Sequence, residues 1–199
     1  MPLLAAVSAI CLAAAVLAFM LNRKPRLAIN EALASAQLRT PERMTSYDAV
    51  KLTEIVRALK SNPSHPEGTL LDLYIRPVLM WNDIIFAVTL ASFAASLWIW
   101  VLLDLEPSGL IRRVVMALAA SSTLYGLFDV AEDVMLIRIL RKPDAISTGD
   151  GWVACQLTRL KLVTIVGSVI GAVVFQTLSW LPSAQSEQRS AGQSGPSGR

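Results

Sequence analysis

Residues 84–103 read IIFAVTLASFAASLWIWVLL, twenty consecutive residues without a charge. A helix of about 20 residues spans roughly 30 Å, the thickness of the hydrocarbon core of a bilayer. Two other uncharged runs, residues 2–22 and residues 162–182, are at least as long. The three runs predict membrane-spanning helices at about 3–21, 84–103 and 162–181.

A fourth apolar run is shorter and ends at an acidic residue. Residues 114–128 are uncharged, and Asp129 follows. The connection at residues 104–113 suits only a tight antiparallel hairpin, so we expect this helix to cross the membrane as well and to continue to about residue 137. The predicted fold is therefore all-α: a four-helix transmembrane bundle within residues 1–182.

The overall composition agrees with a membrane protein and excludes several other classes. Of 199 residues, 54% are hydrophobic and 17% are charged, and the net charge of +3 is too small to indicate a nucleic-acid partner. One histidine and two cysteines, Cys11 in an apolar helix and Cys155 in an expected polar connection, leave little for a metal site, a disulfide or a bound cofactor. Residues 183–199, rich in Ser, Gln and Gly, predict a disordered tail.

The distribution of basic residues predicts the orientation. Of the 18 Lys and Arg residues, nine lie in the connection at 22–81 and five in the connection at 138–161. Basic residues favour the cytoplasmic side, so both connections should be cytoplasmic and both termini outside. The first run could instead be a secretory signal, but its basic residues follow the apolar stretch rather than precede it, which is typical of a retained anchor.

The first connection contains an amphipathic segment. Residues 46–60 alternate apolar and charged positions at helical spacing, and the prolines and glycine of residues 62–68 end the pattern. Residues 70–81 are apolar but interrupted by Asp72, Arg76 and Pro77, so we expect them to lie along the membrane surface. These segments should dock on the inner face of the bundle or on lipid.

Small residues indicate where helices approach one another. The fourth span contains Gly167-x-x-x-Gly171, and similar stripes occur in the other spans. In lipid, such spacing favours close helix packing, either within one chain or between copies in a homo-oligomer. The stripes are Ala5, Ala9 and Ala13 in the first span and Ala87, Ala91 and Ala95 in the second.

The third span carries a polar stripe that cannot face lipid. Five of its side chains fall within an arc of about 100°, namely Ser122, Tyr125, Asp129, Glu132 and Asp133. An acid in hydrocarbon costs about 2.5–3.5 kcal/mol, so these groups should face other helices or water. The polar residues expected at the same depth are Lys161, Arg159, Asn82 and Asp83.

The stripe allows three interpretations. The first is a buried ion-pair network, Asp129 and Glu132 with Lys161, that fixes the register of the bundle. The second is a pathway for protons or cations, or the polar end of a ligand cavity. In the third, Glu132 and Asp133 lie mainly at the surface.

Two short motifs carry a family resemblance. Asp83-Ile-Ile-Phe86 in the second span and Asp129-Val-Ala-Glu132 in the third resemble the D-x-x-F and D-x-x-E-N motifs of a group of small bacterial four-span membrane proteins of uncharacterised function. The chain departs from the second motif, because Asp133 stands where that group has Asn. The resemblance implies a four-span fold in a bacterial inner membrane and implies no activity.

For function, the sequence leaves three classes open. The chain could be a non-enzymatic membrane subunit or interaction protein, stabilised by its acidic stripe, with a protein partner, a second copy or membrane lipid beside it. It could be a small transporter or proton-coupled component that uses Asp129 and Glu132. Least supported is a lipid-modifying enzyme using the same acids, since no nucleophile–base pair accompanies them.

Overall fold

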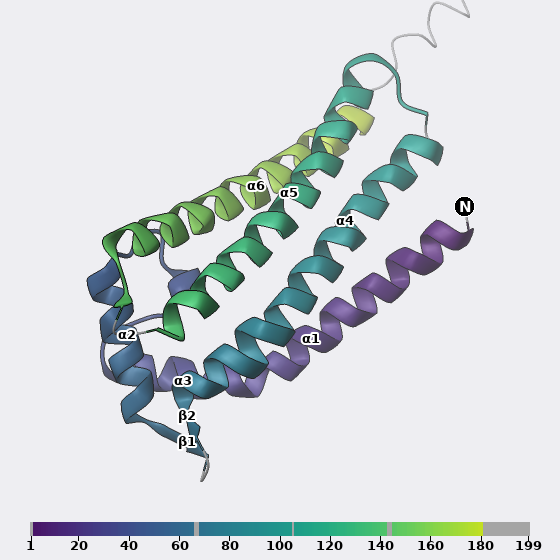
Figure 1. Ribbon diagram of the computed structural model, residues 1–199. Helices are drawn as coiled ribbons and strands as arrows, with labels where there is room; N and C mark the ends of the chain where they lie inside the picture. Colours follow the sequence, from purple (N-terminus) through teal and green to yellow (C-terminus); the bar gives the residue numbers. More distant parts are fainter. Residues whose placement is uncertain (1, 66–67, 105, 143–144, 181–199) are drawn as a thin grey trace, which may run out of the picture.

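A computed structural model of the chain describes residues 2–65, 68–104, 106–142 and 145–180 (Figure 1). Four long helices dominate it and confirm the all-α prediction. By length and composition, each is apolar enough to cross a membrane. These helices are α1 (Pro2–Ser35), α4 (Ile84–Asp104), α5 (Gly109–Leu140) and α6 (Thr148–Trp180).

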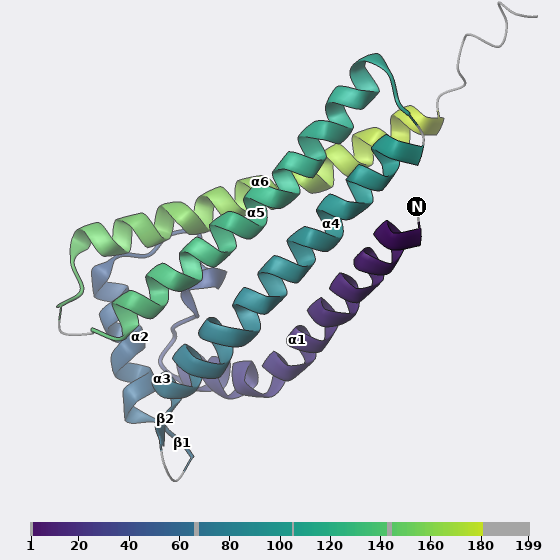
Figure 2. The ribbon, with the colours of Figure 1, turned by 45° about the vertical axis from the view of Figure 1, so that its right-hand side comes forward.

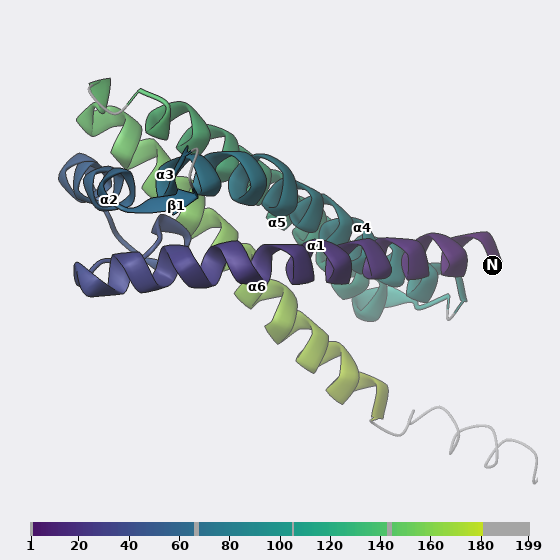
Figure 3. The same ribbon diagram turned by 90° about the horizontal axis from the view of Figure 1, so that it is seen from below.

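The long helices lie side by side in chain order. Extensive contacts join α1 to α4, α4 to α5 and α5 to α6 (Figures 1 and 2). Viewed from below, α6 is inclined to α1 (Figure 3). The helices therefore form a bundle in which each one packs mainly on its neighbour in the sequence.

Two helices extend well beyond the predicted spans. The first helix continues past residue 21 to Ser35, with Pro25 inside it, and α6 begins at Thr148 rather than at residue 162. Most of the predicted connection at 138–161 is therefore helical. Cys155, expected in a polar connection, is buried inside α6. The extension of α1 contains good helix formers such as Arg23, Lys24 and Glu31, which a hydrophobicity count alone does not include.

The second span has no break before it. A capping box formed by Thr69 and Asp72 starts α3 (Leu70–Leu73), which continues through the π-helix η2 (Tyr74–Asp83) into α4. The expected separate surface segment at 70–81 is thus the first part of one long helix. Pro77 lies in the π-helical turns, which are wider than α-helical ones and therefore accommodate a residue that cannot donate the usual backbone hydrogen bond.

The described residues between α1 and α3, 36–65 and 68–69, form a small unit that we call the inter-span cap. It contains the 3-10 helix η1 (Pro41–Arg43), α2 (Ala49–Ser61) and the short paired strands β1 (Pro63–His65) and β2 (Gly68–Thr69). Asp48 caps α2, which forms within the predicted amphipathic segment. The apolar face of α2 packs into the main hydrophobic core with the ends of α1, η2 and α5, through Leu52, Ile55, Val56 and Leu59.

Small residues bring the spans together at two of the expected places. A Cβ on Gly126 would lie only 2.5 Å from Cβ of Ala91, and a Cβ on Gly171 would overlap Leu118. Gly167, by contrast, has no atom of another described residue within 4 Å of the position of an added Cβ, so its predicted helix contact stays a prediction. The alanine stripe of the first span is also exposed rather than packed, at Ala5, Ala9 and Ala13.

Residues 183–199, predicted as a disordered tail, lie outside the described part of the chain.

Candidate functional site

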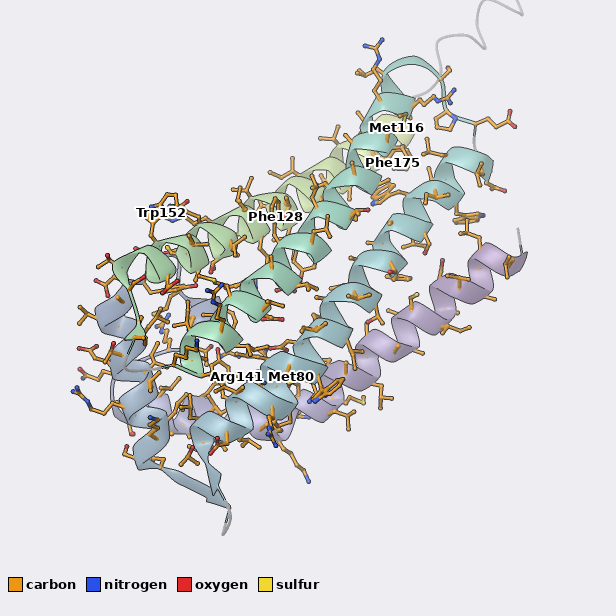
Figure 4. All side chains as sticks on the ribbon, viewed as in Figure 1. Met80, Met116, Phe128, Arg141, Trp152 and Phe175 are labelled. Carbon is orange, nitrogen blue, oxygen red and sulfur yellow. The ribbon has the colours of Figure 1, made fainter. Side chains whose placement is uncertain are left out.

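Buried polar side chains gather where the long helices meet the inter-span cap. Their surroundings are otherwise apolar, and at the far end of the bundle the labelled side chains are Met116 and Phe175 (Figure 4). At the cap end, Arg141 reaches Met80, with 3.4 Å between Nη2 and Sδ. The polar groups form two clusters, one on α5 and α6 and one on α1 and η2.

The first cluster centres on Lys161 of α6. Its Nζ lies 2.8 Å from Oδ1 of Asp129 and 2.5 Å from Oε2 of Glu132, both on α5. Tyr125, one turn before Asp129, donates its hydroxyl to Oδ2 of Asp129 at 3.0 Å. The spacing of 129 and 132 places both acids on one face of α5, so a single cation can pair with both.

Two hydroxyl groups extend this cluster to the cap. Thr158 donates to Oε1 of Glu132 at 2.5 Å, and the Tyr47 hydroxyl lies 3.1 Å from the Thr158 oxygen. Glu132 is fully buried, and Tyr47 belongs to the cap. Burial raises the pKa of the Tyr47 phenol above its usual value, so this group remains a neutral hydrogen-bonding group at physiological pH.

The second cluster joins α1 to η2 and η1. Asp83 accepts from Asn22 and from Arg26, each at 2.5 Å, and both donors lie on α1. The Arg26 guanidinium also lies 3.7 Å from Glu42 of η1, whose carboxylate accepts the Tyr74 hydroxyl at 2.7 Å. Glu42 therefore ties the cap to this cluster, as Tyr47 ties it to the first.

Asp133 is a buried acid whose carboxyl group lacks hydrogen-bond partners within the described part of the chain. Its side chain is only 1% exposed, and its Oδ2 has no hydrogen-bond partner among the described residues. On α5 it follows Glu132 directly and comes one turn after Asp129, so it adjoins the first cluster.

The network contains more acids than bases. Arg26 pairs with Glu42 and Asp83, and Lys161 pairs with Asp129 and Glu132. Asp133 is a fifth buried acid, without an ion pair among the described residues. A buried charge without a partner is costly, so each carboxylate of the network depends on its hydrogen bonds and on the shared cation. Within the described residues, no three His, Cys, Asp or Glu side chains are arranged to hold a metal ion.

The structure brings together most, but not all, of the site residues expected from the sequence. Lys161, Tyr125, Asp129 and Glu132 form one cluster, and Asp83 belongs to the other. Ser122 is buried but donates to the Leu118 carbonyl of its own helix, outside the network. Arg159 binds the Thr45 carbonyl at an exposed position, and Asn82 reaches only Asn22, at 3.4 Å.

Six network members were not expected from the sequence: Asn22, Arg26, Glu42, Tyr47, Tyr74 and Thr158. Asn22 and Arg26 could have been found as a pair four residues apart, had the first helix been extended beyond its apolar run. Nothing in the sequence marks Glu42 or Tyr47, because the fold alone brings the cap to the network.

The charged network ends in the half of the bundle that is nearer to the cap. Farther along the helices, the described hydrogen bonds between different helices are made by serine hydroxyls, and Ser121 donates to the Thr164 carbonyl at 3.0 Å. Ser168 donates to Ser121 at 3.0 Å, and the Ser8 and Ser96 hydroxyls lie 2.6 Å apart. Hydrogen bonds therefore do not continue from Tyr125 across the rest of the described bundle.

Comparisons with protein-family models, with curated proteins and with solved structures found no match. The resemblance based on Asp83–Phe86 and Asp129–Glu132 therefore stays a prediction. Functional conclusions rest on the geometry of the network and the cap.

Proposed function

We propose that this chain is a non-enzymatic membrane subunit or interaction protein, in which the buried acidic network holds the inter-span cap in a fixed position for a partner. The observation that supports this most is that both clusters end on cap residues. Glu42 joins the α1–η2 cluster, and Tyr47 joins the α5–α6 cluster. The cap thus contacts α1, η2 and α6 directly through polar groups, and it reaches α5 through Thr158 and Glu132.

The energetics favour a structural role for these contacts. Paired buried charges contribute little net stability compared with apolar packing, but they penalise every arrangement in which a partner is missing. A shift of α5 along α6 would separate Lys161 from both Asp129 and Glu132. The network therefore selects one register of α5 against α6. The position of the cap follows from that register, because Tyr47 contacts Thr158 of α6.

The proposed orientation places the cap in the cytoplasm and both termini on the opposite side of a bacterial inner membrane. Fourteen of the 18 Lys and Arg residues lie in the segments at 22–81 and 138–161, which supports this orientation. The exposed apolar side chains of α1, α4 and α6 would then face lipid. In this orientation the spans would contact lipid, and the cap would contact the partner protein.

Gentle cross-linking in native membranes tests this function. The full chain, purified by a tag, should retain a defined protein in fixed proportion, identified by mass spectrometry. The double variant Glu42→Gln and Tyr47→Phe, which loosens the cap without altering the apolar spans, should retain much less of it. The exposed pair Arg112→Gln and Arg113→Gln is the control, expected to behave like wild type. Recovery of the wild-type chain alone at every cross-linker concentration would contradict the proposal.

A second candidate, a small proton-coupled component, is favoured by one observation. Asp133 is buried with an unpartnered carboxyl oxygen beside a network that has an excess of acids. A carboxyl group in this position can accept and release a proton where an amide cannot. The third class, a lipid-modifying enzyme, gains no support from the arrangement.

Vesicles that enclose a pH-sensitive dye distinguish the two candidates. If the chain moves protons, an imposed pH gradient should collapse faster with wild type than in empty vesicles, and Asp133→Asn should abolish the difference. The subunit proposal predicts no difference between protein-containing and empty vesicles. It also predicts that Asp133→Asn, which restores the Asn of the resembling group, leaves the fold and partner retention unchanged.

A further inference from the structure

Two hollows lie side by side on the cap, where the chain leaves α1. One, of about 440 Å³, is lined by Asn30 and Ala34 of α1, and the other, of about 400 Å³, by residues 44–46 and Lys51. They share four lining residues: Gln37, Leu38, Arg39 and Arg43. The chain turns sharply here because Gln37 has a φ of 57°, in the left-handed region. The shared residues make the two hollows one continuous basic groove.

The groove carries basic side chains that form no ion pair among the described residues, although the Asp48 carboxylate accepts the backbone N–H of Lys51. Arg39, Arg43 and Lys51 are exposed, and none forms a salt bridge among the described residues. No acidic residue lines either hollow. Glu42, although next to Arg43, directs its carboxylate inward to Tyr74 and Arg26. The groove thus differs from the buried network, where every cation is paired with an acid.

Neutral hydrogen-bonding groups complete the lining. The amides of Asn30 and Gln37 lie in the first hollow or at the junction, and the hydroxyls of Thr45 and Ser46 lie in the second. Guanidinium groups bind phosphate oxygens through two parallel hydrogen bonds, and hydroxyl and amide groups satisfy the remaining oxygens. Each hollow falls within the range of about 300–1,000 Å³ that is common for small-molecule sites.

We propose that this groove binds a phosphate-bearing anion. Arg39 and Arg43 would donate hydrogen bonds to the phosphate, and Lys51 would contribute a third positive charge. The same chemistry would recognise the headgroup of an anionic phospholipid or a soluble phosphate compound. A groove at the junction of α1 and the cap is reachable from either source. This site is independent of the proposed partner function, since it uses no residue of the buried network.

Two probes distinguish the sources with the full chain in detergent. Inorganic pyrophosphate, measured by calorimetry, tests a soluble ligand, and phosphatidylglycerol retained by the intact protein, measured by native mass spectrometry against phosphatidylcholine, tests a lipid headgroup. The variant Arg39→Gln with Arg43→Gln should weaken the binding of the recognised probe about tenfold or more. Arg39→Lys with Arg43→Lys keeps the charge but loses the planar fork, and should give an intermediate loss.

The matched control is Arg57→Gln with Lys60→Gln, an exposed pair on α2 that removes the same charge. Arg57 lines a neighbouring hollow, which contains the acidic Glu54 and shares only Leu38 with the groove. The control should bind both probes as wild type does. Equal weakening by the control pair would show that binding follows total charge and would overturn the site. The proposed site would also be overturned if wild type neither bound pyrophosphate nor retained phosphatidylglycerol in preference to phosphatidylcholine.

Discussion

Lys161→Met tests the buried network most sharply, because methionine keeps most of the length of the lysine side chain while removing its charge. Lys161 pairs with Asp129 at 2.8 Å and with Glu132 at 2.5 Å, and only 11% of its side chain is exposed. The variant leaves two buried carboxylates without their cation. Breaking a buried pair in this way typically costs about 3–5 kcal/mol. We expect a loss of that size in the free energy of unfolding.

The assay is unfolding in mixed micelles with an increasing fraction of a denaturing detergent, followed by far-UV circular dichroism. Adding Glu132→Gln to Lys161→Met should restore about half of the loss, because one uncompensated charge is removed. Lys142→Met, at an exposed position without a described ion pair, should change the free energy of unfolding by less than about 0.5 kcal/mol. A loss of unfolding free energy below about 1 kcal/mol for Lys161→Met, or no recovery in the double variant, would show that Lys161 does not stabilise the two buried acids.

Three other substitutions give expected outcomes in the same assay. Gly126→Ala forces a methyl group against Ala91 at 2.5 Å and should lower the free energy of unfolding by about 1–3 kcal/mol. Gly167→Ala has open space and should be neutral or stabilising by up to about 1 kcal/mol, and destabilisation would reveal a contact that the isolated chain lacks. Asp83→Asn weakens the link to Arg26 and should cost about 1.5–3 kcal/mol, and a neutral effect would exclude this pair from the network.

The membrane class and the helices were predictable because the signal is local. An uncharged run such as 84–103 is long enough to cross a bilayer, and no tertiary information is needed to recognise it. The helix ends were less predictable. The first helix continues to Ser35 through polar residues, so its length depends on helix propensity and on packing against the cap rather than on hydropathy.

The candidate site was predictable only in part. The cost of acids in lipid identified Asp129 and Glu132 and required a cation, and Lys161 and Arg159 were the cations expected at that depth. Of these two, only Lys161 pairs with the acids, because Arg159 binds the Thr45 carbonyl. The contributions of Glu42 and Tyr47 to the network were not predictable, because they depend on how the inter-span cap packs on the helices. Gly167 and Gly171 share one motif, yet within the described residues only Gly171 packs on another helix, since the inclination of α6 decides which glycine meets α5.

Labelling with a membrane-permeant carbodiimide tests the central claim, that the acids of α5 are shielded from lipid by the neighbouring helices. Such a reagent reaches carboxyl groups from within the hydrocarbon, and peptide mass mapping locates the adducts. In native membranes we expect no adduct on Asp129, Glu132 or Asp133, with labelling of all three only after the protein is unfolded in denaturing detergent. Rapid labelling of Glu132 or Asp133 in the folded protein would show that the neighbouring helices do not shield these acids from lipid.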